Sequence, residues 1–290
     1  MLFSLDRCLD FSLNDSRIQL IRLSKKFRCT SSFQQLYTVI FVFALLTLFI
    51  TPASAENGTL KLTTGAEYIT GDFGGTESVD QLYIPVTTSY ATNRYAVRLT
   101  IPYIRLTGPA GTVQSDGTII PGTGEIITDS GIGDVIAGAT YRDAFNTEAT
   151  SDMAIDFTAK IKFGTADEGK GLGTGENDYT IQTELYKFLD RLMLFGILGY
   201  KFRGDPPGID LNDSWLALMG GNYRLSPAFR TGIDLYYQQA SYSGLDDQME
   251  LSAFLGYKLS NTQYLRTYLI KGLSDASPDW GIGVYISFLQ

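Results

Sequence analysis

The sequence predicts an all-β protein, a transmembrane antiparallel up-and-down β-barrel of about 12 strands, preceded by an export signal. Three observations support this prediction. From residue 59 onward, apolar and polar residues alternate with a period of two, and no stretch keeps a helical spacing. Longer and shorter connections follow each other in turn along the chain. Aromatic residues also gather at the ends of the alternating runs.

The N-terminal segment has the features of a secretory signal peptide. An apolar run at 36–50 follows a basic stretch that includes Arg22 and Lys25, and Ala53 and Ala55 form a small-residue cleavage site. The run is shorter than the ~20 residues of a membrane-spanning helix. We therefore expect residues 1–55 to be removed as a signal peptide, an uncleaved anchor being the less favoured alternative, and residues 56–290 to form the barrel.

Removal of the signal peptide sets the chemistry of the mature chain. Both cysteines, Cys8 and Cys29, precede the cleavage site, so the exported protein keeps no thiol and no disulfide. Of 23 basic and 31 acidic residues in the chain, 17 and 28 remain, which is a formal net charge of −11. This charge argues against nucleic acid as a partner, because nucleic-acid phosphates need a basic surface. The chain also has no histidine, the base of Ser-His and Cys-His catalysis, and we expect no enzymatic activity, no cofactor and no metal.

The alternation assigns the first six strands to 59–70, 81–90, 95–106, 131–142, 152–163 and 178–188. The fifth is the clearest, because Ile155 and Phe157 alternate with Asp156 and Thr158. The apolar faces of these strands are Leu60, Leu62, Ala66 and Tyr68; Leu82, Ile84, Val86 and Tyr90; Tyr95, Val97, Leu99, Ile101 and Tyr103; Val135, Ala137, Ala139 and Tyr141; Met153, Ile155, Phe157, Ala159, Ile161 and Phe163; and Tyr179, Ile181, Thr183 and Leu185.

The last six strands are expected at 192–203, 213–224, 228–240, 248–259, 263–272 and 279–290. Two of them are ambiguous. The first has a second set of apolar residues, Met193, Phe195 and Ile197, and 213–224 is apolar on both faces, so its orientation stays open. The clear apolar faces are Leu192, Leu194, Leu198, Tyr200 and Phe202; Phe229, Ile233, Leu235 and Tyr237; Met249, Leu251, Ala253, Leu255 and Tyr257; Leu265, Thr267 and Leu269; and Trp280, Ile282, Val284, Ile286 and Phe288.

Connection lengths separate a membrane barrel from the alternative of a soluble sandwich or barrel. Connections such as 107–130 and 164–177 are long, whereas 91–94, 189–191 and 260–262 are short. Long external loops and short periplasmic turns are typical of outer-membrane barrels. Two aromatic girdles agree with this assignment: Tyr90, Tyr95, Tyr141, Tyr223, Phe229, Tyr257, Tyr264 and Phe288 near the turns, and Tyr68, Tyr103, Phe163, Tyr179, Phe202, Trp215, Tyr237 and Trp280 near the loops.

The polar faces of the predicted strands carry charged residues that a barrel would turn toward its lumen. The lumen-facing candidates are Arg98, Asp134, Asp156, Lys160, Lys162, Glu184, Arg230, Asp234, Glu250, Lys258 and Arg266. They predict either a polar passage that selects solutes or an interior closed by salt bridges. Twelve strands leave both open, because about eight strands enclose a packed interior and about sixteen an open channel.

A glycine-rich, acidic connection lies at 164–177. Gly171, Gly173 and Gly175 resemble a phosphate-binding loop, but the next segment is predicted to be a strand, where such a site needs a helix. Asp167 and Glu176 in the same connection supply oxygen atoms of the kind that hold a hard cation. Their spacing does not match a calcium-binding loop, and a solvated acidic loop is the favoured interpretation.

Three parts of the chain resemble a known family. They are residues 99–109 (LTIPYIRLTGP), 131–134 (GIGD), and 160–167 (KIKFGTAD) together with 172–175 and 178–179. The sequence resembles the outer-membrane transporter family of the meta-pathway of phenol degradation over essentially the whole mature chain. The resemblance implies a location in the outer membrane of a Gram-negative bacterium and transport of small, aromatic or hydrophobic solutes. It supplies no catalytic residues.

Two hypotheses follow for the function. The first is an outer-membrane channel or transporter whose partners are membrane lipid, a small-molecule solute and, during biogenesis, the barrel-assembly machinery. The alternative is a non-conducting structural or adhesive barrel that acts through its extracellular loops. A continuous lumen would distinguish the two.

Overall fold

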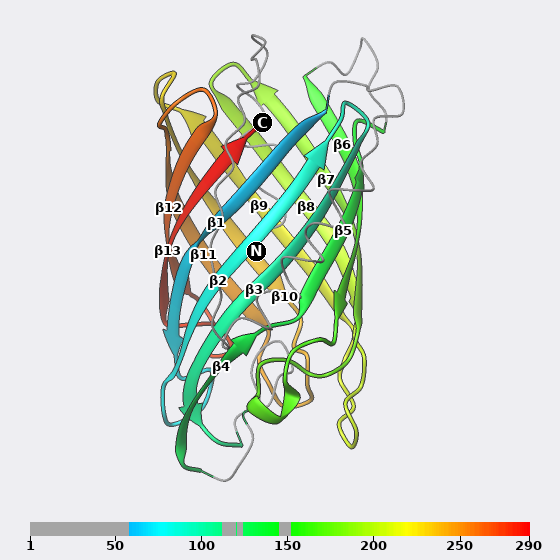
Figure 1. The fold of residues 1–290 in the computed structure, drawn as a ribbon, viewed down its shortest axis with the longest axis vertical. Helices are drawn as coiled ribbons and strands as arrows, with labels where there is room; N and C mark the ends of the chain where they lie inside the picture. Colours follow the sequence, from blue (N-terminus) through cyan, green and yellow to red (C-terminus); the bar gives the residue numbers. More distant parts are fainter. Residues whose placement is uncertain (1–57, 112–119, 121–123, 145–151) are drawn as a thin grey trace, which may run out of the picture. The chain divides into compact units, whose positions relative to one another are not determined.

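The computed structural model describes residues 58–111, 120, 124–144 and 152–290, and these form a closed antiparallel β-barrel (Figure 1). The predicted signal peptide lies outside the described residues, as does most of the loop between residues 110 and 125. The strands are β1 (Thr59–Gly71), β2 (Val79–Ala91), β3 (Tyr95–Pro109), β4 (Ile126–Ile132), β5 (Val135–Tyr141), β6 (Met153–Phe163), β7 (Asp178–Leu189), β8 (Leu192–Phe202), β9 (Ser214–Arg224), β10 (Phe229–Gln238), β11 (Gln248–Lys258), β12 (Gln263–Gly272) and β13 (Trp280–Leu289).

Closure of the barrel comes from the two ends of the described chain. Strands that follow each other in sequence pair, except that β4 and β5 both pair with β3, and β1 also pairs with β13, which closes the ring. In a membrane this matters because an unpaired backbone N–H or C=O group cannot find water there. The predicted fold class, a transmembrane antiparallel barrel of twelve strands, is confirmed. Within the described residues, no helix is both long enough and apolar enough to cross a membrane.

Thirteen strand segments make twelve barrel strands because β4 and β5 are two parts of one strand. Tyr103 of β3 pairs with Ile132, but Thr100 pairs with Ile136, so the register shifts by one residue at Gly133 and Asp134. This is a β-bulge, in which one extra residue re-aims the side chains. A Cβ atom on Gly133 would lie 2.4 Å from Cδ1 of Ile104, so a larger residue there would displace that side chain.

One predicted connection is wrong in its bounds, because strand pairing continues beyond the bulge. Residues 107–130 were expected to form a loop, but β3 runs to Pro109 and β4 begins at Ile126, so the two strands pair well beyond the bulge. Figure 1 shows β4 projecting at the lower end of the barrel. Alternation missed β4 because the bulge exchanges the inner and outer faces. Ile126 and Ile132 are exposed at even positions in β4, whereas Ala139 and Tyr141 are exposed at odd positions in β5.

The outer surface is apolar, as the alternation predicted. Exposed large side chains recur at every second position, for example Val97, Phe157, Ile181, Leu198 and Ile282. Aromatic rings pair near both ends of the barrel: Tyr95 with Tyr141, Phe229 with Tyr257, Tyr68 with Trp280, and Tyr200 with Trp215. Tyr264 differs from the prediction, because it is buried on the inner face and does not join a girdle.

The two ends of the barrel are not equivalent. One end, which we call the turn end, has the connections at 92–94, 142–152, 190–191, 225–228 and 259–262 and the end of β13; all of these but 142–152 are four residues or shorter. The other, the loop end, has the connections at 72–78, 110–125, 164–177, 203–213, 239–247 and 273–279. The asymmetry predicts that the turn end faces the periplasm and the loop end the cell exterior.

Cysteine labelling tests this orientation, since the mature chain is expected to lack cysteine. We expect an impermeant maleimide to label Asp275→Cys, at the loop end, on intact cells. It should label Asn261→Cys, at the turn end, only after the outer membrane is opened. Both side chains are exposed, so accessibility alone does not separate them. The reverse pattern would invert the orientation.

Candidate functional site

The inner face of the barrel is the candidate site, because there the sheet turns polar and charged side chains toward one enclosed space. Its burial pattern is the complement of the outer one: Asp156, Thr158 and Gln182 are buried, whereas Phe157 and Ile181 beside them are exposed on the other face. The predicted candidates other than Asp134 occupy this inner face at alternating strand positions; they are Arg98, Asp156, Lys160, Lys162, Glu184, Arg230, Asp234, Glu250, Lys258 and Arg266. Asp134 lies in the β-bulge.

Glu184 is held by a dense hydrogen-bond network on the inner wall. Its carboxylate accepts hydrogen bonds from the Thr158 hydroxyl at 2.8 Å and the Gln182 amide at 2.6 Å. The Tyr186 hydroxyl donates a third, also at 2.6 Å. Glu184 is only 5% exposed, and a buried carboxylate is stable when its oxygens are satisfied in this way. Glu184 therefore connects β6 to β7 and stabilises the inner wall.

A second network fixes the connection at 164–177. Asp134 accepts backbone hydrogen bonds from Thr165 and Ala166, each at 2.9 Å, and its second oxygen lies 3.0 Å from the Lys162 ammonium. Lys162 also lies 3.4 Å from Asp178. We call these residues, Asp134, Lys162 and Asp178, the latch. The latch holds the loop against the bulge, so Asp134 and Lys162 have a structural task in addition to carrying charge.

The glycines of the loop serve this close packing. Gly171 and Gly175 have positive φ angles of 65° and 75°, which glycine adopts without strain. A Cβ atom on Gly173 would lie 2.7 Å from Oδ2 of Asp134. The loop contains a short 3-10 helix, η4 (Glu168–Lys170), and the glycines that follow it lead into β7. Gly171 and Gly175 are therefore explained by their positive φ angles, and Gly173 by its close approach to Asp134.

The same loop carries an apolar side chain inward. Leu172 is buried in a cluster with Val79, Leu106 and Ile120 at the loop end. A Cβ atom on Gly131, on the inner face of β4, would lie 2.9 Å from Leu172, so the loop packs against the inside of the wall. Apolar packing and the latch therefore both hold this loop against the inner wall at the loop end.

Two further apolar clusters lie on the inner face. One joins Ala154, Tyr186, Met193, Phe195, Ile197 and Leu218 from β6 to β9. The other joins Phe254, Tyr268, Ile270 and Tyr285 from β11 to β13. The Arg266 guanidinium carbon lies 4.0 Å from the centre of the Phe254 ring, in a cation–π contact. These clusters explain the second apolar face of 192–203 and of 213–224: Met193, Phe195, Ile197, Leu216 and Leu218 point inward.

A cavity of about 220 Å³ opens on the inner face between these polar and apolar regions. Three lysines line it from β6 and β8, together with polar groups of β7 and apolar side chains of the neighbouring strands. The lining residues are Ile136, Lys160, Lys162, Asp178, Thr180, Gln182, Ile197, Lys201, Leu216, Leu218 and Tyr236. We call it the lysine cavity.

Sequence reasoning missed Lys201 and the apolar side of this cavity. The signal was present in strand parity, since Lys201 stands between Tyr200 and Phe202 and so shares the face of Met193, Phe195 and Ile197. The second apolar set of 192–203 hides this parity, because both faces of the strand then look apolar. The inner wall is in fact amphipathic.

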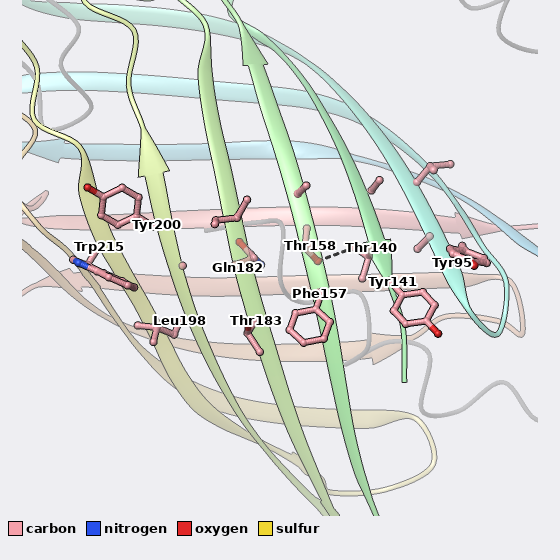
Figure 2. A pocket seen from close by; sticks show the side chains of 16 residues that line it. Tyr95, Thr140, Tyr141, Phe157, Thr158, Gln182, Thr183, Leu198, Tyr200 and Trp215 are labelled. Carbon is pink, nitrogen blue, oxygen red and sulfur yellow. Dashed lines mark hydrogen bonds between the residues drawn. The ribbon is translucent and has the colours of Figure 1, made fainter. Parts of the chain in front are cut away.

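A groove of about 590 Å³ crosses the outer surface from β3 to β9 (Figure 2). Ala139 and Ala159 are register partners. Their small side chains leave a depression beside the larger Tyr141 and Phe157. Figure 2 shows Tyr141, Phe157, Thr183 and Leu198 along this surface. Because these side chains belong to the apolar outer face, the groove suits the hydrocarbon chains of lipid.

The acidic residues of the 164–177 loop are not gathered around one point. Asp167 lies 4.0 Å from Lys170 in an exposed ion pair. Among residues 58–111, 120, 124–144 and 152–290, no group of three or more Asp, Glu, His or Cys side chains is arranged to hold a metal ion.

Comparison with known proteins agrees with the barrel. The model of a protein family described as "Putative MetA-pathway of phenol degradation" matches residues 51–289. No curated protein matches the sequence. The crystal structure of the COG4313 outer membrane channel from Pseudomonas putida F1 is similar, with a TM-score of 0.66 and 14% identity over 83% of this chain and 100% of that chain. The NanC porin is also similar, with a TM-score of 0.51 and 13% identity over 78% of this chain and 98% of that chain.

Proposed function

The chain belongs to the family described as "Putative MetA-pathway of phenol degradation", and we propose that it is an outer-membrane channel or transporter for small, aromatic or hydrophobic solutes. The observation that carries the proposal is the amphipathic inner wall. A barrel that only holds a shape has no need of a lumenal cavity with lysines on one side and buried apolar side chains on the other. The Pseudomonas putida F1 protein of the same fold is an outer membrane channel, which supports the same role here.

The latch and the Leu172 cluster favour a gated or narrow path over a wide water-filled pore. Both lie at the loop end, where a solute from outside would enter. Twelve strands lie between the packed interior of about eight and the open channel of about sixteen, and inward packing narrows this barrel further. A narrow path with an apolar wall suits small solutes.

The proposal includes the route to the membrane and the partners there. Residues 1–55 would direct export and be cleaved, and the barrel-assembly machinery would insert the folded strands. Lipid would then cover the apolar outer face, with acyl chains in the groove beside Ala139 and Ala159. No catalytic step is proposed, and the inner charges serve solute passage and wall stability.

Ion selectivity tests the proposal. Replacing Lys160 and Lys201 with Glu reverses two lumenal charges, and charged groups in a narrow passage bias which ions enter. We expect the reversal potential of the purified protein in planar bilayers, under a KCl gradient, to shift toward cation selectivity. Lys162 is unsuited to this test because its replacement would also break the latch.

The matched control is the double replacement of Lys187 and Lys271 with Glu, an equal charge change outside the lumen. It should leave the reversal potential unchanged, and heat-modifiable gel mobility should report an intact barrel in every variant. A wild-type barrel that inserts but passes neither ions nor solutes would contradict the channel and favour the non-conducting structural or adhesive barrel.

A further inference from the structure

Asp234 is a buried carboxylate on the inner face of β10 without a hydrogen-bond partner among the described residues. Only 2% of its surface is exposed, and neither of its two oxygen atoms accepts a hydrogen bond. A buried charge in this state destabilises a fold unless a donor reaches it. Glu184 is similarly buried but accepts three hydrogen bonds. The contrast marks Asp234 as a group with acceptor atoms to offer a ligand.

Two aromatic rings lie next to Asp234. Its register partner in β9 is Gly220, and Gly232 precedes it on the same face of β10. A Cβ atom on Gly220 would lie 2.7 Å from Cζ of Phe195, and one on Gly232 would lie 2.3 Å from Cε1 of Phe254. The rings therefore occupy the space that the two glycines leave, one across the sheet from Asp234 and one along its strand.

We propose that Asp234 binds the ammonium group of a small organic amine, with Phe195 and Phe254 as its aromatic neighbours. An ammonium group donates hydrogen bonds that a carboxylate accepts, and a cation is attracted to the face of an aromatic ring. The inference rests on the proposed channel function, which it deepens by assigning a chemical class of solute and a place on the wall where that solute binds.

The structure already holds one cation beside these rings. The guanidinium carbon of Arg266 lies 4.0 Å from the centre of the Phe254 ring and 5.7 Å from that of Tyr268. Arg266 also acts electrostatically on Asp234, although it makes no hydrogen bond to either carboxylate oxygen. This part of the wall therefore stabilises positive charge.

The carboxylates around Asp234 outnumber the basic groups that act on them. Glu250 interacts electrostatically with both Asp234 and Glu67, and Arg266 is the basic side chain that acts on Asp234. These four residues are three carboxylates and one guanidinium, in the mature chain without the predicted signal peptide and its terminal amino group. Glu67 and Glu250 each accept a hydrogen bond from a side chain of the wall, whereas Asp234 accepts none. A second cation would offset the excess at Asp234.

The remaining basic residues on the inner face of β1 and of β10 to β13 lie toward the turn end. They are Lys61, Arg230 and Lys258. Arg230 is the nearest to Asp234 along a strand, four residues before it, which is about 13 Å at ~3.4 Å per residue. The Asp234 level of this wall is thus the acidic one.

The loop end favours the same class of solute at the entrance. Each of its connections contains at least one Asp or Glu among the described residues, and these described residues include two basic ones, Lys170 and Arg203. Charge of one sign at an entrance raises the local concentration of a solute of the opposite sign. A cationic solute is therefore attracted first by the loop end and then by Asp234.

The surroundings of Asp234 also select the rest of the solute. Phe195 belongs to the inner apolar cluster of β6 to β9, and Phe254 to that of β11 to β13. An apolar body gains from covering these rings, whereas a hydrated inorganic cation does not. Among the described residues, no group of three or more Asp, Glu, His or Cys side chains is arranged to hold a metal ion. Phenethylamine is the simplest probe that carries both an ammonium group and an apolar body.

Calorimetric titration of the detergent-solubilised wild-type protein near neutral pH tests the inference. The probes are phenethylamine, phenethyl alcohol, which keeps the ring without the charge, and methylamine, which keeps the charge without the ring. We expect the dissociation constant of phenethylamine to be at least about tenfold below that of either comparison. Block of the potassium current in planar bilayers by the same three probes should follow the same order.

Two variants assign the preference to the carboxylate and to the rings. Asp234→Asn keeps the shape but removes the charge, and should abolish the preference for phenethylamine over phenethyl alcohol. Phe195→Leu keeps an apolar side chain but removes one ring, and should weaken phenethylamine binding by about threefold. Asp190→Asn is the matched control, because Asp190 lies at the turn end with 87% of its side chain exposed, and it should change neither.

The denaturation midpoint separates a ligand site from a structural ion pair. Removal of a buried charge that has no hydrogen bond does not weaken a fold, so Asp234→Asn should not lower the midpoint. A lower midpoint together with an unchanged preference for phenethylamine would make Asp234 a structural partner of Arg266 and would overturn the inference.

The outcomes also separate the inference from the function on which it rests. Equal binding of phenethylamine and phenethyl alcohol would overturn the ammonium site while a measurable current upholds the channel, and equal binding of phenethylamine and methylamine would overturn the role of the rings. Absence of any current would contradict the channel, and the titration would still decide the site. If the variants failed to fold, the three-probe titration of the wild-type protein alone would support or overturn the inference.

Discussion

Replacing Phe157 with Arg is expected to destabilise the inserted barrel by about 2–4 kcal/mol. Phe157 lies at the middle of β6, on the outer face, with 42% of its surface exposed. In the membrane that surface meets hydrocarbon, where an arginine loses its hydration without gaining a partner. The penalty depends on depth, which makes the position within the strand part of the prediction.

Reversible folding into lipid vesicles, followed by denaturant titration, measures this effect. Phe163→Arg is the depth control, because Phe163 lies on the same outer face of the same strand but at its end. Its cost should fall to about 0–1 kcal/mol, as expected near the interface. Equal costs at the two positions would contradict the depth assignment, and a negligible cost at Phe157 would mean that this face does not meet lipid.

Replacing Asp134 with Ala is expected to release the latch, at a cost of about 2–3 kcal/mol. The change leaves two backbone N–H groups without an acceptor and removes the nearer of two carboxylates from Lys162. The cost stays below the ~3–5 kcal/mol of breaking a fully buried pair. The reason is that the Lys162 side chain keeps 22% of its surface exposed and retains Asp178.

Limited trypsin digestion measures the release of the 164–177 loop, because Lys170 lies in this loop and is partly exposed. We expect cleavage after Lys170 to become at least about tenfold faster in Asp134→Ala, together with a lower denaturation midpoint. Asp167→Ala is the matched control: it removes an exposed carboxylate of the same loop, 4.0 Å from Lys170, and should cost less than about 1 kcal/mol. Unchanged cleavage in the Asp134 variant would show that other contacts hold the loop.

Local patterning determined most of the barrel. Because successive side chains of a strand point to opposite faces, the alternation around Phe157 and Asp156 assigned the two faces without any tertiary information. The number of alternating runs, with their connection lengths, likewise predicted twelve antiparallel strands. The charged residues of the inner face followed from the same parity, and all but Asp134 occupy regular strand positions there.

The local sequence pattern did not predict two features. The bulge at Gly133 shifts the register by one residue, and only the pairing of β3 with both β4 and β5 reveals it. The direction of the apolar residues in 213–224 is also undetermined locally, because both faces are apolar there and an inward leucine such as Leu218 differs from an outward one only by its neighbours.

The sequence alone therefore determined the strand number and the direction of most side chains, because these depend on residue type and period. The export signal at residues 1–55 stays a prediction from the sequence. Only the tertiary structure decided which charges meet. It places Lys162 between Asp134 and Asp178, and Lys201 beside Thr180 in a cavity with Leu216. These contacts join side chains from the bulge before β5 through to β9, and the pairing register of neighbouring strands sets them. No local period encodes that register.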